Sequence, residues 1–106
     1  VWGGYSYDTD IVANVFGYNA EAIAIEHGRE NRIVANRFVR DRLAVNLWKN
    51  ERQDPNWAYV RKHDTTSRDY RIAGNRFEDC ARTIAVRATE RVVEQDRYTT
   101  IHIEEL

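Results

Sequence analysis

The chain has 106 residues, of which 42% are hydrophobic and 31% charged, a composition typical of one folded domain and not of a disordered or two-domain protein. No stretch approaches the roughly 18 apolar residues of a membrane-spanning helix, and the first ten residues lack the pattern of a secretion signal. The single cysteine, Cys80, rules out an internal disulfide, so we expect a cytoplasmic protein without a membrane partner.

Charge is unevenly distributed along the chain. Residues 29–82 carry 13 Lys or Arg and 8 Asp or Glu, a net charge of +5, whereas the two flanks together carry −6. Most of the basic residues are Arg, which favours bidentate and stacked contacts. Two explanations remain open, an anionic partner for the basic centre or a compositional bias of the genome.

Residues 1–19 are predicted to form an N-terminal extension, or an additional strand and turn. The segment 11–30 resembles a DNA-binding helix-turn-helix, in which a small residue and a turn glycine let two helices pack at a steep angle. The residues with this spacing are Ala13, Gly17, Asn19 and Ile23. The resemblance implies binding to duplex DNA.

The next two elements are predicted to be a strand and a helix. AEAIAIEH (20–27) is rich enough in apolar residues to be a strand, although Ala and Glu also favour a helix. After Asn36, the spacing of Val39, Leu43 and Leu47 predicts a helix. It should end before Asp54-Pro55, because proline lacks an amide hydrogen and moves its predecessor out of helical geometry.

The second half repeats this order. WAYVRKH (57–63) and DYRIAG (69–74) are predicted strands, and YTTIHIEEL (98–106) alternates with period two as a third. A helix is predicted from Asn75 to about Gln95. Its apolar side chains recur at spacings of three and four: Phe77, Ala81, Ile84, Ala88 and Val92. Asn75 and Glu78 would cap it, and Cys80 would be a buried, inert thiol at the edge of the stripe.

The order strand-helix-strand-strand-helix-strand predicts an α+β, two-layer sandwich of ferredoxin-like topology over residues 20–106, within a single domain of residues 1–106. A repeated frame supports two related halves. RIVANRF (32–38) and RIAGNRF (71–77) share Ile, Asn and Phe at the same spacing, which suits a strand-to-helix joint whose Asn caps the helix. A third copy, DIVANVF (10–16), runs into Gly17 and has no place in this scheme.

The sequence gives no clear chemical signature. The three histidines, His27, His63 and His102, share no metal-ligand spacing, and Cys80 has no catalytic context. We therefore predict no catalytic residues, no metal, no cofactor, and a protein that is more readily a binding module than an enzyme.

The alternation of the strands predicts one binding surface. On the sheet face opposite the helices, the exposed side chains would be Trp57, Tyr59, Arg61, His63 and His102. Such an aromatic and basic patch is typical of a partner site. We expect a non-enzymatic binding or regulatory module that self-associates or binds a protein. Two alternatives stay open, namely single-stranded nucleic acid on this face and residues 1–19 covering it.

Overall fold

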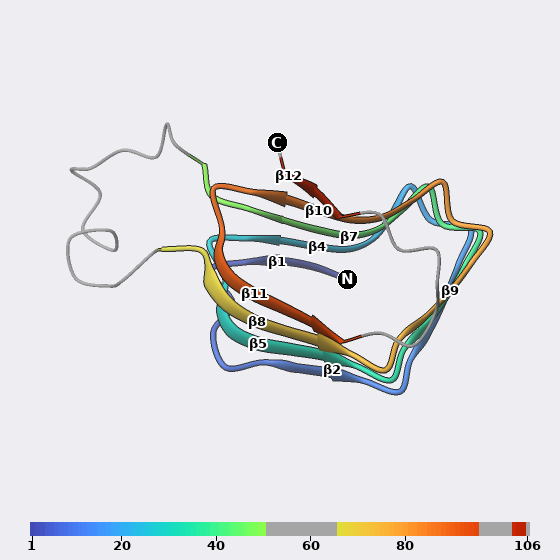
Figure 1. The fold of residues 1–106 in the computed structure, drawn as a ribbon, viewed down its shortest axis with the longest axis horizontal. Coiled ribbons are helices and arrows are strands. Elements are labelled where there is room, and N and C mark those ends of the chain that lie inside the picture. The colour runs from blue at the N-terminus through green and yellow to red at the C-terminus, as the bar shows by residue number, and fades with distance from the viewer. Residues whose placement is uncertain (51–65, 96–102, 106) are drawn as a thin grey trace.

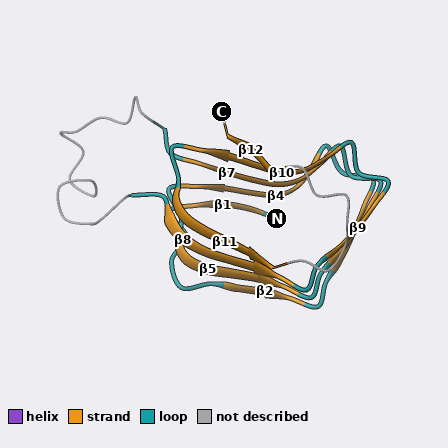
Figure 2. Ribbon diagram, in the orientation of Figure 1, coloured by secondary structure: helices purple, strands orange, loops and turns teal. Residues whose placement is uncertain are grey.

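The computed structural model describes residues 1–50, 66–95 and 103–105, and within these ranges every regular element is a β-strand (Figures 1 and 2). The strands are β1 (Trp2–Gly4), β2 (Asp10–Val12), β3 (Val15–Gly17), β4 (Glu21–Glu26), β5 (Arg29–Val34), β6 (Arg37–Val39), β7 (Leu43–Trp48), β8 (Arg68–Ala73), β9 (Arg76–Glu78), β10 (Arg82–Arg87), β11 (Glu90–Gln95) and β12 (Ile103–Glu105). The predicted α+β ferredoxin-like sandwich is therefore wrong.

The strands form three parallel sheets that the chain visits in turn. The sheet orders are β1-β4-β7-β10-β12, β11-β8-β5-β2 and β3-β6-β9. One passage through β2, β3 and β4 makes a coil, and the next coils, β5-β6-β7 and β8-β9-β10, stack on it (Figure 1). This architecture is a parallel β-helix, in which each coil buries its apolar side against its neighbours.

The repeated frame marks equivalent positions in three successive coils. Ile11 lies opposite Ile33, and Ile33 opposite Ile72, so the copies are stacked directly on one another. The offset is 22 residues in the first step and 39 in the second. The third copy, DIVANVF, which had no place in the predicted fold, is the first of the three coils.

The asparagines of the frame form a ladder at the turn between the first two strands of each coil. The backbone N–H of Asn14 donates to Asn36 Oδ1, and that of Asn36 to Asn75 Oδ1, each at 2.9 Å. The side-chain amide of Asn36 also donates to the Ile11 carbonyl at 2.8 Å. Asn36 and Asn75 are fully buried, so these bonds satisfy backbone groups that the turn removes from the sheets. The asparagines therefore hold coils together and do not cap helices.

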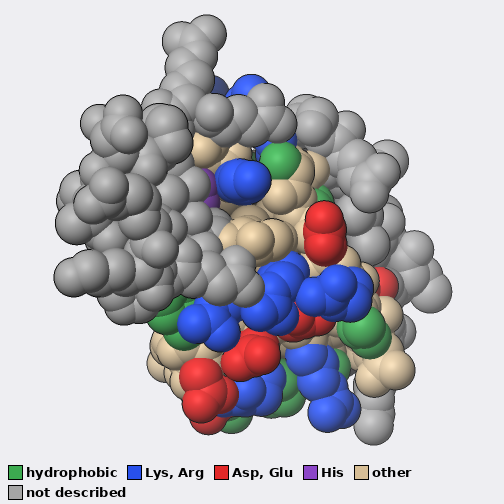
Figure 3. Space-filling view, turned by 90° about the vertical axis from the view of Figure 1, so that its left-hand side faces the viewer, with side chains coloured by type: hydrophobic (Ala, Val, Ile, Leu, Met, Phe, Trp, Pro, Cys, Tyr) green, Lys and Arg blue, Asp and Glu red, His purple; other side chains and the backbone are tan. Residues whose placement is uncertain are grey.

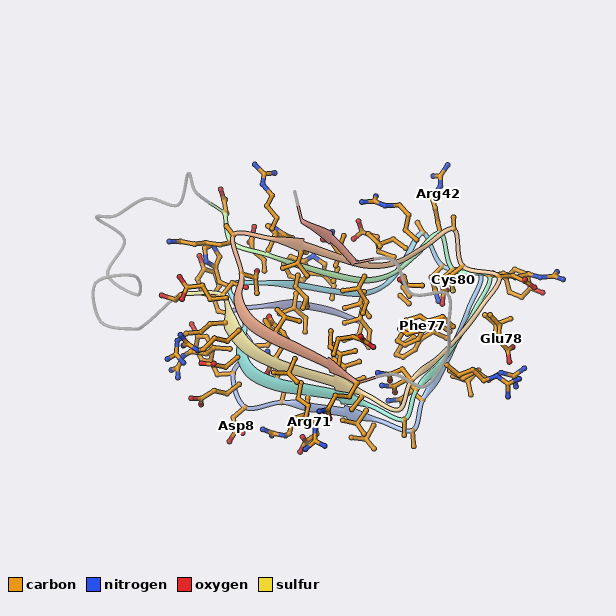
Figure 4. The ribbon with its side chains drawn as sticks, viewed as in Figure 1. Asp8, Arg42, Arg71, Phe77, Glu78 and Cys80 are labelled. Atoms are coloured by element: carbon orange, nitrogen blue, oxygen red, sulfur yellow. The ribbon has the colours of Figure 1, made fainter. Side chains whose placement is uncertain are left out.

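A stack of phenylalanines follows the ladder. The rings of Phe16, Phe38 and Phe77 lie one above another, with 5.1 Å between neighbouring centroids and nearly parallel planes. Phe38 is fully buried between the other two, and Figure 4 shows Phe77 turned toward the space that the sheets enclose. The frame thus contributes an aliphatic row, a polar ladder and an aromatic stack to the interior.

The predicted helix over 75–95 is instead β9, β10 and β11. Phe77, Ile84 and Val92 do share one interior, but each belongs to a different strand. In short strands separated by short turns, an equivalent inward side chain recurs every seven or eight residues. Two turns of an α-helix have nearly the same spacing, so the sequence pattern resembles that of a helix. The predicted helix after Asn36 is likewise wrong, because Val39 ends β6 and Leu43 begins β7.

Two of the predicted strands are confirmed. Residues 20–27 contain β4, and residues 69–74 coincide closely with β8. The strand predicted at 57–63 lies outside the described residues, and of 98–106 only β12 is described. The segment 11–30 holds the end of β2 and all of β3 and β4, so the helix-turn-helix interpretation is wrong, and the duplex DNA binding that it implied has no helix to support it there.

The core lies between the sheets. Opposite the Ile11–Ile33–Ile72 row, Ile23, Val45 and Ile84 form a second row in successive coils, and all three are fully buried. Each such side chain contributes about 1.5–3 kcal/mol on burial. Within the described ranges, no helix is present that could cross a membrane.

Candidate functional site

The outer face of the sheet β11-β8-β5-β2 carries side chains in straight rows, because parallel strands in register place equivalent residues next to one another. One row consists of Asp10, Arg32, Arg71 and Val93. A second row, two residues farther along each strand, consists of Val12, Val34, Ala73 and Gln95. Asp8, Glu30, Asp69 and Arg91 precede the first row, and each has a left-handed backbone with φ between 50° and 58°.

Carboxylates neutralise Arg32 at one end of this face. Its guanidinium donates to Asp8 at 2.9 Å and makes a second, shorter contact with Asp10. These bonds raise the pKa of Arg32 above its ordinary value, the bond with Asp10 contributing most. Arg32 is therefore already committed to partners within the chain.

Asp69 forms ion pairs with two further arginines. Arg91 donates to its two carboxylate oxygens at 2.5 and 2.9 Å, and Arg68 contacts it from the other side. The hydrogen bond from Arg91, and next that from Arg68, lower the pKa of Asp69 to about 2. Arg68 also lies 3.8 Å from Glu30, so these charges form one network.

Arg71 differs from these arginines. Its side chain is exposed and has no hydrogen bond or ion pair with any residue in the part of the chain that the structure describes. Figure 4 shows Arg71 and Asp8 on the outer side of the sheet, turned away from the interior. Arg71 lies in a shallow depression of about 800 Å³, which Glu30, Asn31, Arg32, Asp69, Tyr70, Arg91, Val93 and Gln95 also line.

The floor of the depression is rigid. Tyr70 is almost completely buried, and burial raises the pKa of its hydroxyl to about 12. A Cβ on Gly28 would come within 2.2 Å of that hydroxyl and within 2.7 Å of Asn31 Nδ2, so only glycine fits at this turn. Asn31 accepts a bond from the backbone N–H of Thr9 at 2.8 Å and donates to the Ser6 carbonyl at 2.9 Å. Arg71 thus stands above a fixed polar layer.

The neighbouring side of the molecule is also charged but well mixed. In Figure 3 basic and acidic side chains alternate over the turns that lead into this sheet. Arg29 and Glu30 are one such pair of opposite charges, 3.9 Å apart. The guanidinium of Arg29 also lies 4.4 Å from the centroid of the Tyr7 ring. Among the described residues, this side of the molecule therefore has no extended patch of only positive or only negative charge.

A second surface of interest is the first coil. β2 and β3 are the terminal strands of their sheets, so one edge of each is unpaired among the described strands. Six large hydrophobic residues are exposed in the described part of the chain, and five of them belong to residues 1–18. The five are Val1, Trp2, Val12, Val15 and Tyr18. Exposed apolar area beside an unpaired strand edge favours association.

The predicted binding residues cannot be placed beside these surfaces. Trp57, Tyr59, Arg61, His63 and His102 all lie outside the described residues, so the predicted aromatic patch stays a prediction. The same holds for single-stranded nucleic acid on that patch.

Cys80 occupies a structural position. It stands at the level of Asn19 and Asp41 in the neighbouring coils, where the Asn19 backbone N–H donates to Asp41 Oδ1 at 2.8 Å. The thiol is half-buried and lies 3.5 Å from the Phe38 carbonyl, and burial raises its pKa. A raised pKa lowers the thiolate fraction, which agrees with an inert thiol. In the described ranges no three His, Cys, Asp or Glu residues gather as metal ligands.

Comparison with known proteins identifies no relative: no family description, no curated protein and no solved structure matches this chain. The sequence contained one sign of the first surface, since the alternation Tyr70-Arg71-Ile72 in a strand places Arg71 on the face opposite two buried residues.

Proposed function

We propose that the protein is a non-enzymatic interaction module that self-associates through its first coil, with a second copy of the chain as the partner. The observation that carries this proposal is the concentration of exposed apolar side chains there. Val15 and Tyr18, in and directly after the edge strand β3, are 72% and 74% exposed. Trp2, which is 70% exposed, lies on β1, the strand that pairs with β4 of the same coil.

The first members of the asparagine ladder and of the phenylalanine stack support a partner that adds a β-strand to the first coil. Inside the ladder, each asparagine Oδ1 accepts a backbone N–H from the preceding coil, whereas Asn14 Oδ1 has no donor in the described part of the chain. Phe16 stacks on Phe38 with one face of its ring. The first coil therefore exposes a hydrogen-bond acceptor, Asn14 Oδ1, and one face of the Phe16 ring. In the next coil, the equivalent groups of Asn36 and Phe38 contact the preceding coil.

A second copy fits because its first coil carries the same features. Two first coils related by a two-fold axis would bring the strand edges together in antiparallel fashion and cover both sets of apolar side chains. Such an interface is closed, so it yields a dimer and not a filament. Arg32 offsets one of the two negative charges of Asp8 and Asp10, which reduces the repulsion between the two copies.

Analytical ultracentrifugation of the 106-residue chain over a range of concentrations tests this proposal. We expect a dimer that Val15→Lys converts to a monomer, because a lysine at a strand edge opposes edge pairing. Val93→Lys is the matched control, since Val93 is 51% exposed but lies on β11, away from the first coil. A monomer at every concentration, or equal effects of the two variants, would contradict the proposal.

The predicted patch is a second route to the same function. Trp57→Ala and Tyr59→Ala in the same experiment test it, because only that route requires these two side chains. We keep the cytoplasm as the proposed compartment on the basis of the free thiol of Cys80.

A further inference from the structure

The depression around Arg71 has the features of an anion site that is independent of self-association. Of the arginines that line it, Arg32 is bound by Asp8 and Asp10, and Arg91 by Asp69. Arg71 is the cation that remains without a carboxylate on this outer face, as far as the described residues show. Its neighbours in the row are Arg32 on one side and Val93 on the other.

The charges around Arg71 are largely paired with one another, which leaves its guanidinium as the group that can meet an anion. Arg32 lies on the adjacent strand, but Asp8 and Asp10 already bind its guanidinium, so it adds no free positive charge. A guanidinium presents a planar fork that matches the oxygens of a carboxylate or a phosphate. The uncommitted fork of Arg71 is therefore the recognition group.

The other residues that line the depression restrict the charge and the chemical type of the ligand. Val93 is 51% exposed and adjoins Arg71, which provides apolar contact beside the cation. Glu30 and Asp69 border the depression and would repel a ligand with many negative charges. No aromatic side chain belongs to the two outward rows of the sheet β11-β8-β5-β2 that border the depression, so the stacking that single-stranded nucleic acid uses is missing there.

We propose that this depression binds a small organic anion that has one carboxylate or phosphate group attached to an apolar group. The oxyanion is held by the Arg71 guanidinium, and the apolar group covers Val93. Gln95, at the edge of the depression, can donate a hydrogen bond from its side-chain amide to the same oxyanion.

Nuclear magnetic resonance titration of the 106-residue chain tests the site. The probes are 2-naphthoate, 1-naphthyl phosphate, inorganic phosphate and the neutral 2-naphthylmethanol. We expect saturable shifts of the Arg71 Nε–Hε signal and the Val93 methyl signals with both naphthyl anions, and weaker binding of the other two. A preference between the two naphthyl anions then identifies the oxyanion.

Two variants distinguish binding at Arg71 from non-specific attraction of the anion to any exposed arginine. Arg71→Gln should weaken binding by about tenfold or more, since it removes a charge-assisted pair of hydrogen bonds. Arg42→Gln is the control, because Arg42 is also exposed and has no ion pair in the described ranges, but Figure 4 shows it on the other side of the molecule. Both side chains are exposed, and the amide spectrum confirms that each variant folds.

Equal weakening by the two variants, or equal affinity for 2-naphthylmethanol, would overturn the anion site. Failure to dimerise would not affect it. Val15→Lys, which removes the proposed dimer, should bind the probes as the unmodified chain does, and loss of binding in Val15→Lys would place the site at the interface and overturn the proposal.

Discussion

At the scale of single residues, the three asparagines of the ladder stabilise the fold because their side chains and backbone form hydrogen bonds between neighbouring coils. Asn36 accepts from Asn14, donates to the Ile11 carbonyl and lies 3.1 Å from Asn75 Oδ1. Such buried amides replace the backbone bonds that a turn between two sheets interrupts. Their removal leaves buried backbone groups without partners, which costs more than the lost bonds themselves.

We expect Asn36→Ala to lower the free energy of unfolding by about 2–4 kcal/mol, measured by urea denaturation. Asn14→Ala is the control, because Asn14 is exposed and its side chain, among the described residues, makes bonds only to Val12 and Asn36. It should cost about 1 kcal/mol or less. Equal losses in the two variants would show that burial in the ladder is unimportant.

Asp69 gives a pH dependence with a defined sign. Its pKa is lowered from 3.8 to about 2, so its ion pairs favour the folded state above pH 4 and this contribution is lost as the pH falls from 4 to 2. Titration of the Asp69 carboxyl carbon by nuclear magnetic resonance should show a midpoint near 2. Arg91→Gln should raise that midpoint, because the bond from Arg91 is the main cause, and Arg42→Gln should leave it unchanged. An unshifted midpoint in Arg91→Gln would mean that Arg91 does not hold this carboxylate in solution.

At the scale of the elements, the turns are as repetitive as the strands. The residue before each ladder asparagine has a left-handed backbone: Ala13 at φ 57°, Ala35 at φ 57° and Gly74 at φ 63°. Only the third coil has the glycine that this conformation favours. The two alanines therefore carry strain that glycine would remove.

Ala35→Gly should raise the free energy of unfolding by about 0.5–1 kcal/mol, because relief of the left-handed alanine exceeds the extra entropy that glycine loses on folding. The measurement is again urea denaturation. Ala81→Gly is the control: Ala81 is exposed and its φ is not positive, so the same change should destabilise by about 0.5–1 kcal/mol. Destabilisation by both variants would contradict the strain at Ala35.

Prediction of the elements from the sequence succeeded at two strands. The strand predicted at 20–27 contains β4, although its Ala and Glu also favour a helix, and the strand predicted at 69–74 overlaps most of β8. The failure at 75–95 has a physical cause. Inward residues such as Phe77 and Ile84 are seven positions apart both in a helix and across two short strands joined by a turn, so the local pattern fits both.

At the scale of the whole molecule, the coils share one length except at a single junction of the described chain. Two residues, 27–28, join β4 to β5, and two, 88–89, join β10 to β11, whereas nineteen, 49–67, separate β7 from β8. The difference of 17 residues accounts for the offset of 39 in place of 22. Lys49 and Ser67 flank this extra length, and Ser67 Oγ lies 2.7 Å from Thr89 Oγ1 in the next coil.

Deletion of residues 50–66 joins Lys49 to Ser67 and should leave the β-helix folded. The shorter connection favours folding by up to about 2 kcal/mol, and loss of the bond from the Asn50 backbone N–H to His27 Nε2 costs about 1 kcal/mol. Circular dichroism should keep its β-rich form, with one cooperative thermal transition. Deletion of residues 29–45, equal in length but removing β5, β6 and the first three residues of β7, should abolish that transition. Retention of it would argue against stacked coils.

The sequence by itself determined the ordinary globular composition, the strands predicted at 20–27 and 69–74, and the recurrence of Ile, Asn and Phe as a unit. Only the tertiary structure decided what that unit means. The same three residues can end a strand and begin a helix, or line the inside of a coil, because local spacing is similar in both. The decisive interactions join residues that are 22 or 39 positions apart, such as the Asn36 backbone N–H and Asn75 Oδ1, and these form only when one coil lies on another.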